Sequence, residues 1–568
     1  MKSAFASAMT SVFLTLVTAL AGAAQSDKPQ APQRIGIHGE KTLSLPDAIG
    51  MALANNKDIE SALIDTQVAR FSFTAAKGAF DPKFSVQTPY IRSITPMGSV
   101  LAGAADGKLL EKDFSAVPQL NGIVPWTGTS FSLGFSSKRS VTNNSFATLN
   151  PQYPSSFTIA VTQPLRRGFR FDSNRQYVEV ARKNVALSDE QFRQSVSDIV
   201  TQAAKNYWDL VYAIQNQEVQ GMAAETARRQ VESNRRMMEQ GVMAPIDLVE
   251  AETQLAQFEQ NVYAAQASLT AAENSLKSMI LPDRTSPLWA NALIPITEPK
   301  APPAEELLDD LVNEAIASRP ELAQLKIQSE VNQTNLRYYR EQMKPQLDLV
   351  GSYMSSGLAG VVSTSSAPNP FTAGFSAMID RINQLAALQN LPPVDMSALG
   401  ALGGSGVPEA LVGGYGHSLS NLYGFGFPTV QVSLQFSLPL RNRTAEGNMA
   451  AGLAEVHRTD IRCKQMEQQI QADVRNAMQS LASYKMALEA ARTARRSAQE
   501  QYASEQRKFN AGTSTLFLVL QRQTTLVTTQ SSELRAQTDL AKATADFERA
   551  VGRTLKANNV VLRDVQQR

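Results

Sequence analysis

The chain has 568 residues, and its 54 basic and 52 acidic side chains leave a net charge of +2. This balance gives no sign of a nucleic-acid-binding surface and is typical of a solvated surface of mixed charge. The single cysteine, Cys463, excludes an intramolecular disulfide, and the three scattered histidines give no zinc site. No cluster of His, Cys or carboxylate residues and no phosphate-binding loop is present, so we predict no catalytic, cofactor-binding or metal-binding residues and no enzyme.

Residues 1–23 have the pattern of a secretory signal peptide. Lys2 precedes an apolar run over about residues 8–21, and Ala21-Gly22-Ala23 offers a small-residue cleavage site. No later stretch approaches the roughly 18 apolar residues of a membrane helix. We therefore predict that the chain is exported, and that it can cross a membrane only as a closed β-barrel.

The mature chain is predicted to begin with a loose segment and a helix. Residues 25–41 are polar and rich in proline, so they are expected to be loose. Ser44 can cap a helix whose apolar residues recur at helical spacing to about Ala79. Asp81-Pro82 then stops this helix, because a residue before proline disfavours the helical conformation.

From Lys83 onward the sequence changes to the pattern of strands. Alternation of apolar and polar residues predicts strands at 84–88, 131–135 and 157–162. The stretch at about 95–112 is rich in Gly, Ser and Pro and is expected to be a loop. The helices before Pro82 and after Pro164 should lie on the same side of the membrane, so the strand number must be even. Residues 120–124 are therefore the candidate for a fourth strand.

Two glycines, Gly241 and Gly512, each stand between two long stretches that contain almost no helix breakers. Glycine in this position is typical of a helix C-cap followed by a reversal of the chain. Pro245 suits the first turn of the helix that restarts after Gly241. We therefore predict two long antiparallel helical hairpins with the glycines at their tips. Their arms cover about residues 174–240, 245–280, 449–510 and 513–551.

The order of elements occurs twice, which indicates an internal duplication. Three pairs of anchors recur at offsets of 263, 275 and 271 residues: Pro82 and Pro345, Pro164 and Pro439, and Gly241 and Gly512. Residues 355–426 of the second half are predicted to be one long loop, with a short helix around Met378 and Ile382. The predicted organisation is a first repeat at 24–281, a linker at 282–303, a second repeat at 304–556 and a C-terminal tail at 557–568.

This duplicated pattern resembles the outer-membrane efflux protein family, the TolC-like exit ducts of tripartite pumps and type I secretion systems. The residues that carry the resemblance are Leu45-x-x-Ala48-x-x-x-Ala52-Leu53-x-Asn55-Asn56, Gln163-Pro164-Leu165, and Gly241 through Asp247 with Gly512. The resemblance implies a mixed α and β membrane protein that is a homotrimer. Each protomer would give four strands to a twelve-stranded outer-membrane β-barrel, and its long helices would form an α-helical barrel across the periplasm.

The resemblance also implies a location, partners and a mechanism. The chain would lie in the cell outer membrane, surrounded by lipid, and extend into the periplasm as a passive, water-filled duct. It would contact a periplasmic adaptor (membrane fusion) protein and work with an inner-membrane transporter. The residues implied in docking the adaptor at the hairpin tips are Gly241, Val242, Pro245, Gly512, Thr513 and Leu516.

By the same resemblance, the helices that follow the tips line a periplasmic constriction. The residues implied there are Asp247, Glu250, Leu518 and Gln521. Family members that close this end tightly often carry acidic residues about two turns after the second glycine, whereas this chain carries its acidic residues on the first hairpin. We therefore hypothesise that the pore depends less on an acidic gate in the second hairpin. Asp247 can also be interpreted as a helix-start charge that complements the helix dipole.

Two other classes of protein share some of these features. A periplasmic adaptor has a signal peptide and a helical hairpin, but it would show one hairpin flanked by small β domains and no duplication. An exported coiled-coil scaffold would not need the amphipathic strands that end at Pro164 and Pro439.

Overall fold

The computed structural model describes residues 34–98, 103, 107–298, 306–363, 370–389, 391–394 and 407–562, and the predicted signal peptide lies outside this part. Within it the chain is mixed helix and sheet and mostly helical. It divides into two compact units. Among the described residues, the first contains those up to Ile64, those of Gln191–Leu322 and those from Met466 onward, and the second contains those of Asp65–Glu190 and Ala323–Gln465. This division by contacts differs from the division into sequence repeats, which stays a prediction.

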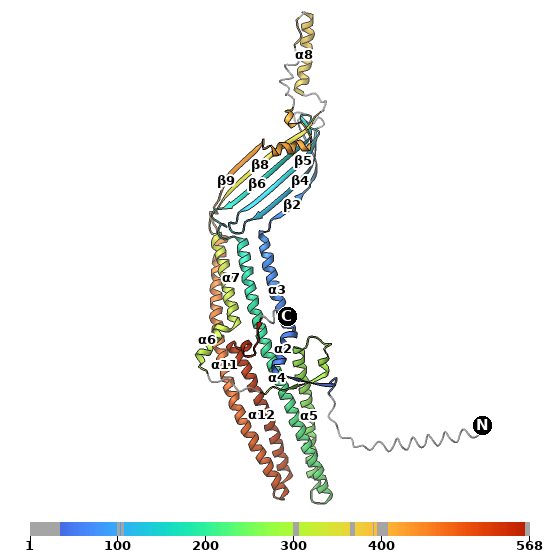
Figure 1. The fold of residues 1–568 in the computed structure, drawn as a ribbon, viewed down its shortest axis with the longest axis vertical. Helices are drawn as coiled ribbons and strands as arrows, with labels where there is room; N and C mark the ends of the chain where they lie inside the picture. Colours follow the sequence, from blue (N-terminus) through green and yellow to red (C-terminus); the bar gives the residue numbers. More distant parts are fainter. Residues whose placement is uncertain are drawn as a thin grey trace, which may run out of the picture. The chain divides into compact units, whose positions relative to one another are not determined.

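The second unit contains one antiparallel sheet (Figure 1). In the order in which they pair, its strands are β2 (Lys83–Gln87), β4 (Lys108–Ile123), β5 (Ser130–Thr142), β6 (Leu149–Pro164), β8 (Gln346–Val362) and β9 (Pro428–Ser437). A further strand, β3 (Tyr90–Pro96), pairs with the part of β4 that β2 does not reach. Together β2 and β3 form one interrupted edge of a sheet that is six strands wide.

The register gives this sheet one apolar and one polar face, because side chains alternate along every strand. One register row consists of the apolar residues Phe84, Leu120, Leu133, Ile159, Tyr353 and Val430. The next row points to the other side and consists mostly of polar residues: Ser85, Gln119, Gly134, Thr158, Met354 and Thr429. We call these two sides of the sheet the apolar face and the polar face.

The helices of the second unit are joined to one another by polar side chains. They are most of α3 (Lys57–Lys77), the start of α4 (Ser173–Glu239), most of α7 (Pro320–Gln342), and the start of α11 (Arg443–Asn510). Gln176 of α4 donates to Asn335 of α7 at 2.7 Å, and Asn332 of α7 donates to Thr459 of α11 at 2.8 Å. Two shorter helices, α8 (Pro370–Leu388) and α10 (Tyr415–Tyr423), lie in the sequence between β8 and β9.

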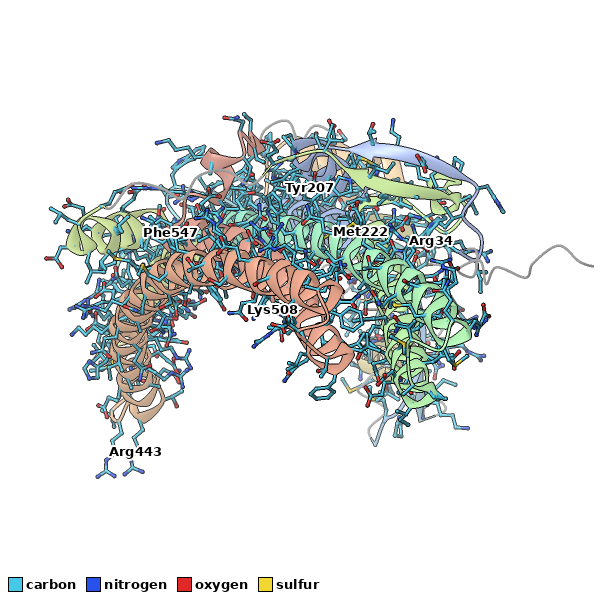
Figure 2. The ribbon with its side chains drawn as sticks, turned by 90° about the horizontal axis from the view of Figure 1, so that it is seen from below. Arg34, Tyr207, Met222, Arg443, Lys508 and Phe547 are labelled. Carbon is cyan, nitrogen blue, oxygen red and sulfur yellow. The ribbon has the colours of Figure 1, made fainter. Side chains whose placement is uncertain are left out.

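The first unit contains the two helical hairpins (Figure 1). One pairs α4 with α5 (Pro245–Ile280), and the other pairs α11 with α12 (Leu516–Val551). The other elements of this unit are α2 (Leu45–Asn55), α6 (Leu308–Ser318), α13 (Thr554–Ala557) and the parallel strands β1 (Gly39–Leu43) and β7 (Asn291–Pro295). Tyr207 of α4, labelled in Figure 2, is completely buried and donates to the Leu43 carbonyl at 3.1 Å, so it fixes β1 to the first hairpin.

Several predictions about the elements are confirmed. The hairpin arms agree with the predicted ranges to within six residues, and α5 covers 245–280 as expected. The Ser44 side chain accepts a hydrogen bond from the Asp47 backbone at 3.2 Å, as an N-cap residue does. The helix expected from Ser44 to Ala79 is instead two helices, because Asn56 ends α2 and its side chain accepts from the Asp58 backbone at 2.8 Å to start α3.

Four segments that were expected to be irregular contain regular structure. The loop predicted at 95–112 is shorter, because β3 ends at Pro96 and β4 begins at Lys108. The segment expected to be loose and the predicted linker each contain a strand, and these strands pair with each other as β1 and β7. The long loop predicted at 355–426 contains the second half of β8, then α8 and α10; α8 confirms the short helix expected around Met378.

Candidate functional site

The two hairpin tips have the same backbone geometry. Gly241 and Gly512 both adopt left-handed conformations, with φ of +70° and +77°. In each tip the residue after the glycine donates to the carbonyl five residues back, from Val242 to Met237 at 3.0 Å and from Thr513 to Lys508 at 2.9 Å. These bonds form the Schellman arrangement, which satisfies helix carbonyls that would otherwise lack partners.

The tips expose backbone and small side chains. No atom outside the neighbouring residues lies within 4 Å of the position that a Cβ of Gly241 or Gly512 would take. Val242 is 75% exposed, and Pro245 and Thr513 are exposed as well. Leu516 differs from the other predicted docking residues, because only 4% of it is exposed. Its side chain therefore packs inside the unit at the start of α12.

The second tip has an additional polar contact between its two arms. Ser514 donates to Glu505 at 2.5 Å, and this hydrogen bond holds the pKa of the Glu505 carboxyl below its ordinary value. Lys508, labelled in Figure 2, lies 3.6 Å from the same carboxylate and also favours its charged form. These contacts close the loop between α11 and α12 around a charged group.

Apolar clusters join the two hairpins side by side behind the tips. Near the tips, residues of both hairpins are buried together: Val231, Leu248, Ala251, Leu516 and Leu520. Farther along, Phe258 of α5 and Val527 of α12 pack with small residues of α4: Ala223, Ala224 and Ala227. The alanines let the helices approach closely, so α5 and α12 are held at a fixed spacing along this part of the unit.

A groove of about 720 Å³ runs between α5 and α12. The residues of α5 that line it are Val249, Glu250, Thr253, Gln254 and Gln257. The residues of α12 that line it are Phe517, Leu520, Gln521, Thr524, Thr525, Thr528 and Thr529. Because both helices come from hairpin tips, the groove begins within the first turns after the two reversals.

The lining of the groove is rich in hydrogen-bond acceptors. Four threonine hydroxyls of α12 donate to carbonyls of their own helix, for example Thr525 to Gln521 at 3.0 Å and Thr528 to Thr524 at 2.9 Å. Their lone pairs thus remain available to a molecule in the groove. Glu250 adds a negative charge, and none of the lining residues is basic. Phe517, 60% exposed, adds an apolar surface.

The structure places the four residues predicted to line a constriction in two groups. Glu250 and Gln521 face the same groove from opposite helices, whereas Asp247 and Leu518 are not among its lining residues. Asp247 lies in the first turn of α5, where its charge can complement the helix dipole. The sequence interpretation did not identify Phe517 or the four threonines of α12. The threonines recur at spacings of three and four residues, which places them on one side of the helix and could have indicated a shared surface.

Two further observations concern the kinds of site that the described residues can form. No group of three or more His, Cys, Asp and Glu side chains is placed to hold a metal ion in the part of the chain that the structure describes. In the same part, no helix has the length and apolar character needed to cross a membrane.

Comparison with known proteins gives one family and several similar folds. The family described as outer membrane efflux protein matches residues 129–280 and 409–553, which together are more than half of the chain. No curated protein matches the chain. Structures with similar folds include the CmeC outer membrane channel of Campylobacter jejuni, at 13% identity and a TM-score of 0.59, covering 92% of this chain and 89% of that one.

Two further structures extend this likeness to other organisms. The outer membrane protein VceC of Vibrio cholerae is 14% identical with a TM-score of 0.58, and the alignment covers 89% of this chain and 96% of VceC. The open state of the MtrE outer membrane channel of Neisseria gonorrhoeae is 15% identical with a TM-score of 0.56, covering 94% of this chain and 98% of MtrE. At these identities the likeness shows a common fold.

Proposed function

The chain belongs to the outer membrane efflux protein family, and from this premise we propose how its sheet, tips and groove serve transport. As a member of this family it is located in the outer membrane, extends into the periplasm and is an exit duct of tripartite efflux pumps. This membership replaces the adaptor and scaffold alternatives that the sequence left open.

We propose that three copies close their sheets into one barrel, and the observation that carries this proposal is the two-faced sheet. Its apolar face suits lipid and its polar face suits water. Its edge strands, β9 and the interrupted β2 and β3, have no further partner among the described strands. Edges of this kind favour pairing with another chain. β2 follows α3 and β9 leads into α11, so the two edges run in opposite directions and fit an antiparallel contact between copies.

The strand number of this barrel differs from the number that the resemblance implies. Each sheet is six strands wide, so three copies contribute three times six, or eighteen, strands instead of twelve. The extra pair comes from the first half of the chain, where β4 and β5 are paired to each other as a hairpin. Since barrel diameter grows with strand number, we expect an outer-membrane pore of porin width.

We propose that the tips contact a periplasmic adaptor, which in turn joins the duct to an inner-membrane transporter. The support is the exposed backbone at Gly241 and Gly512, together with exposed Val242, Pro245 and Thr513. Leu516 contributes by packing, because its side chain is buried and holds the start of α12 in place.

We propose that the groove between α5 and α12 faces the substrate path at the periplasmic constriction. Its support is the acceptor-rich lining with Glu250 on one helix and Gln521 on the other. In a trimer this lining would occur three times around one path and would favour cations and hydrogen-bond donors. Asp247 and Leu518 would border the same constriction from positions outside the groove.

The first experiment separates cell membranes and compares gel migration of unheated and heated samples after cross-linking. A trimer in the outer-membrane fraction is the expected result. A monomer in that fraction would contradict the shared barrel, whereas a soluble chain in the periplasm would contradict the exit duct itself. Export of a pump substrate by cells that lack their own duct, restored by this chain, provides the functional readout.

A further inference from the structure

Small residues let helix α10 pack closely against the sheet. A Cβ at Gly357 would lie 2.2 Å from the Ser418 carbonyl oxygen, so only glycine allows this close approach. The Ser155 and Ser418 hydroxyls lie 2.7 Å apart, and Ser355 donates to the Leu422 carbonyl at 2.8 Å. The helix is therefore a fixed part of the sheet surface.

The helix lies on the apolar face of the sheet. Ser355 and Gly357 follow Tyr353 along β8 at intervals of two, so all three point to the same side. Ser155 of β6 is paired directly with Gly357 and shares that side. These hydrogen bonds and this close approach thus involve the face that carries the apolar register row. A helix on the polar face would instead stand in the proposed water-filled pore.

The position of α10 along the strands is the end farther from the long helices. β8 begins at Gln346, directly after α7, and α10 packs over the later part of this strand. β9 runs in the opposite direction, from Pro428 beside Ser355 back to α11. In a sheet that spans the outer membrane with α7 and α11 on the periplasmic side, this end is the outer one.

Aromatic side chains stand at both ends of α10 and just after it, and they remain exposed. Tyr415 and Tyr423, at the two ends of the helix, are 44% and 67% exposed, and Phe425 after it is 56% exposed. Tyr415 makes an edge contact with Tyr153 at 6.3 Å, and Phe425 lies 6.4 Å from Tyr353. Aromatic rings with a polar tip are enriched where membrane proteins cross from lipid to water.

We propose that α10 lies at the outer lipid–water interface and binds the headgroup region of the surrounding lipid. This inference rests on the proposed placement of the sheet in the outer membrane. The apolar face below the helix, with Val430 and Val432 at 69% and 71% exposure, provides the continuous lipid contact that leads up to it. The tyrosines at both ends of α10 fix how deep the sheet sits, because their rings prefer the interface to either side of it.

The test uses spin labels at three single cysteines, introduced after Cys463→Ala, in the full chain reconstituted in vesicles of phosphatidylethanolamine and phosphatidylglycerol. The positions are Tyr423→Cys on α10, Val432→Cys on the apolar face and Gln431→Cys on the polar face. The measured quantity is the ratio of collisions with oxygen, which enters lipid, to collisions with a nickel complex, which stays in water. We expect a ratio several-fold higher at 432 than at 431, with an intermediate ratio at 423.

The three positions distinguish failure of the inference from failure of the proposed function. A ratio at 423 equal to the ratio at 431 would place α10 in water, and a ratio equal to that at 432 would place it deep in lipid. Either result overturns the interfacial helix. Equal, low ratios at 431 and 432 would show that neither face meets lipid, which overturns the membrane placement of the sheet and the inference with it.

Discussion

The two helical hairpins have the same backbone geometry at their tips, but the ends opposite the tips are held in different ways. In the first hairpin, Glu273 and Lys277 of α5 are almost completely buried, and their charged atoms lie 2.8 Å apart. Glu273 also pairs with Arg34 and accepts from the Leu293 backbone at 3.1 Å, while Lys277 donates to the Trp289 carbonyl at 3.0 Å. These contacts tie α5 to the segment around β7 through a buried charged network.

In the second hairpin the corresponding ties are partly exposed. Arg553, just after α12, pairs with Glu306 and Glu314 near α6, and its side chain is 28% exposed. Arg319, which is only 8% exposed, donates to Asp473 of α11 at 2.9 Å, and this carboxylate is 33% exposed. Exposed pairs contribute little to stability, whereas breaking a buried pair leaves an uncompensated charge. The same tip geometry is therefore supported by a buried charged network in one hairpin and by partly exposed ion pairs in the other.

The largest difference between the hairpins is expected when each loses one charged side chain from the end opposite its tip. Lys277→Met leaves Glu273 buried with one partner fewer, so we expect a loss of about 3–5 kcal/mol in the free energy of unfolding. Arg553→Gln is the matched change in the second hairpin, and a loss of about 1 kcal/mol is expected there. Thermal unfolding of the purified protein measures both. Equal losses of unfolding free energy in the two variants would refute the distinction between the two hairpins.

The buried charged network of the first hairpin should also make the stability of the protein depend on pH. Burial, and then the positive charge of Arg34, lower the pKa of Lys277 to about 8. An unfolded lysine has a pKa near 10.4, so the unfolded chain binds more protons between pH 8 and 10. The contribution of Lys277 to the free energy of unfolding therefore rises with pH in this window, by up to about 3 kcal/mol. Unfolding midpoints of the wild type and Lys277→Met should diverge from pH 8 to 10, and parallel pH profiles would count against the shifted lysine.

Because the two tips have the same backbone geometry, we expect substitution of either tip glycine to destabilise its hairpin equally. Gly241→Val and Gly512→Val each place a β-branched residue at positive φ, which costs roughly 1–2 kcal/mol. Hydrogen exchange of the amides in the last helical turns should speed up to a similar degree in both variants. Gly221→Ala, inside α4 with open space around the added Cβ, is the control and should stabilise by up to about 1 kcal/mol. A loss at one tip alone would show that their geometries are not equivalent in solution.

The smallest effects are expected for side chains near the constriction. Glu250→Gln removes the groove's negative charge and should lower cation selectivity by less than about fivefold, as suits an exposed charge worth ~1 kcal/mol or less. Asp247→Ala should act in the same direction from outside the groove, and Gln521→Ala should change selectivity less than either. Single-channel recordings in a planar bilayer measure these ratios. If Gln521→Ala changes ion selectivity most, the hypothesis that the pore depends less on a gate in the second hairpin is wrong.

The sequence predicted the hairpins well because their signals are local. Gly241, Pro245 and Gly512 each act within one helical turn, and the helical periodicity around them extends over many residues. The strand boundaries were less accurate, since the charged start of β4 at Lys108 and the glycine-rich end of β8 look like loops. The pairing of β1 with β7 joins residues about 250 positions apart, and neither strand is long enough to show an alternating pattern.

The candidate site was predictable in part for the same reason. Its glycines follow from helix capping, but the shared groove of Glu250 and Gln521 depends on how two distant helices pack. The buried pair of Glu273 and Lys277 has the spacing of an ordinary surface pair on one helix, so its burial could not be read from the sequence. Leu516 was expected to meet a partner at the tip, whereas the structure packs its side chain between the hairpins.

A disulfide scan across the two edges of the sheet tests whether copies of the chain close it into one barrel. In a Cys463→Ala background, Ser85→Cys on β2 is combined in turn with cysteines along the polar side of β9 at Gln431, Ser433 and Gln435. We expect covalent trimers on a non-reducing gel for one register of these pairs, and none for the control of Ser85→Cys with Ser132→Cys on β5. Monomers at every register of β9, with the protein in the outer membrane, would contradict a barrel shared by copies of this chain.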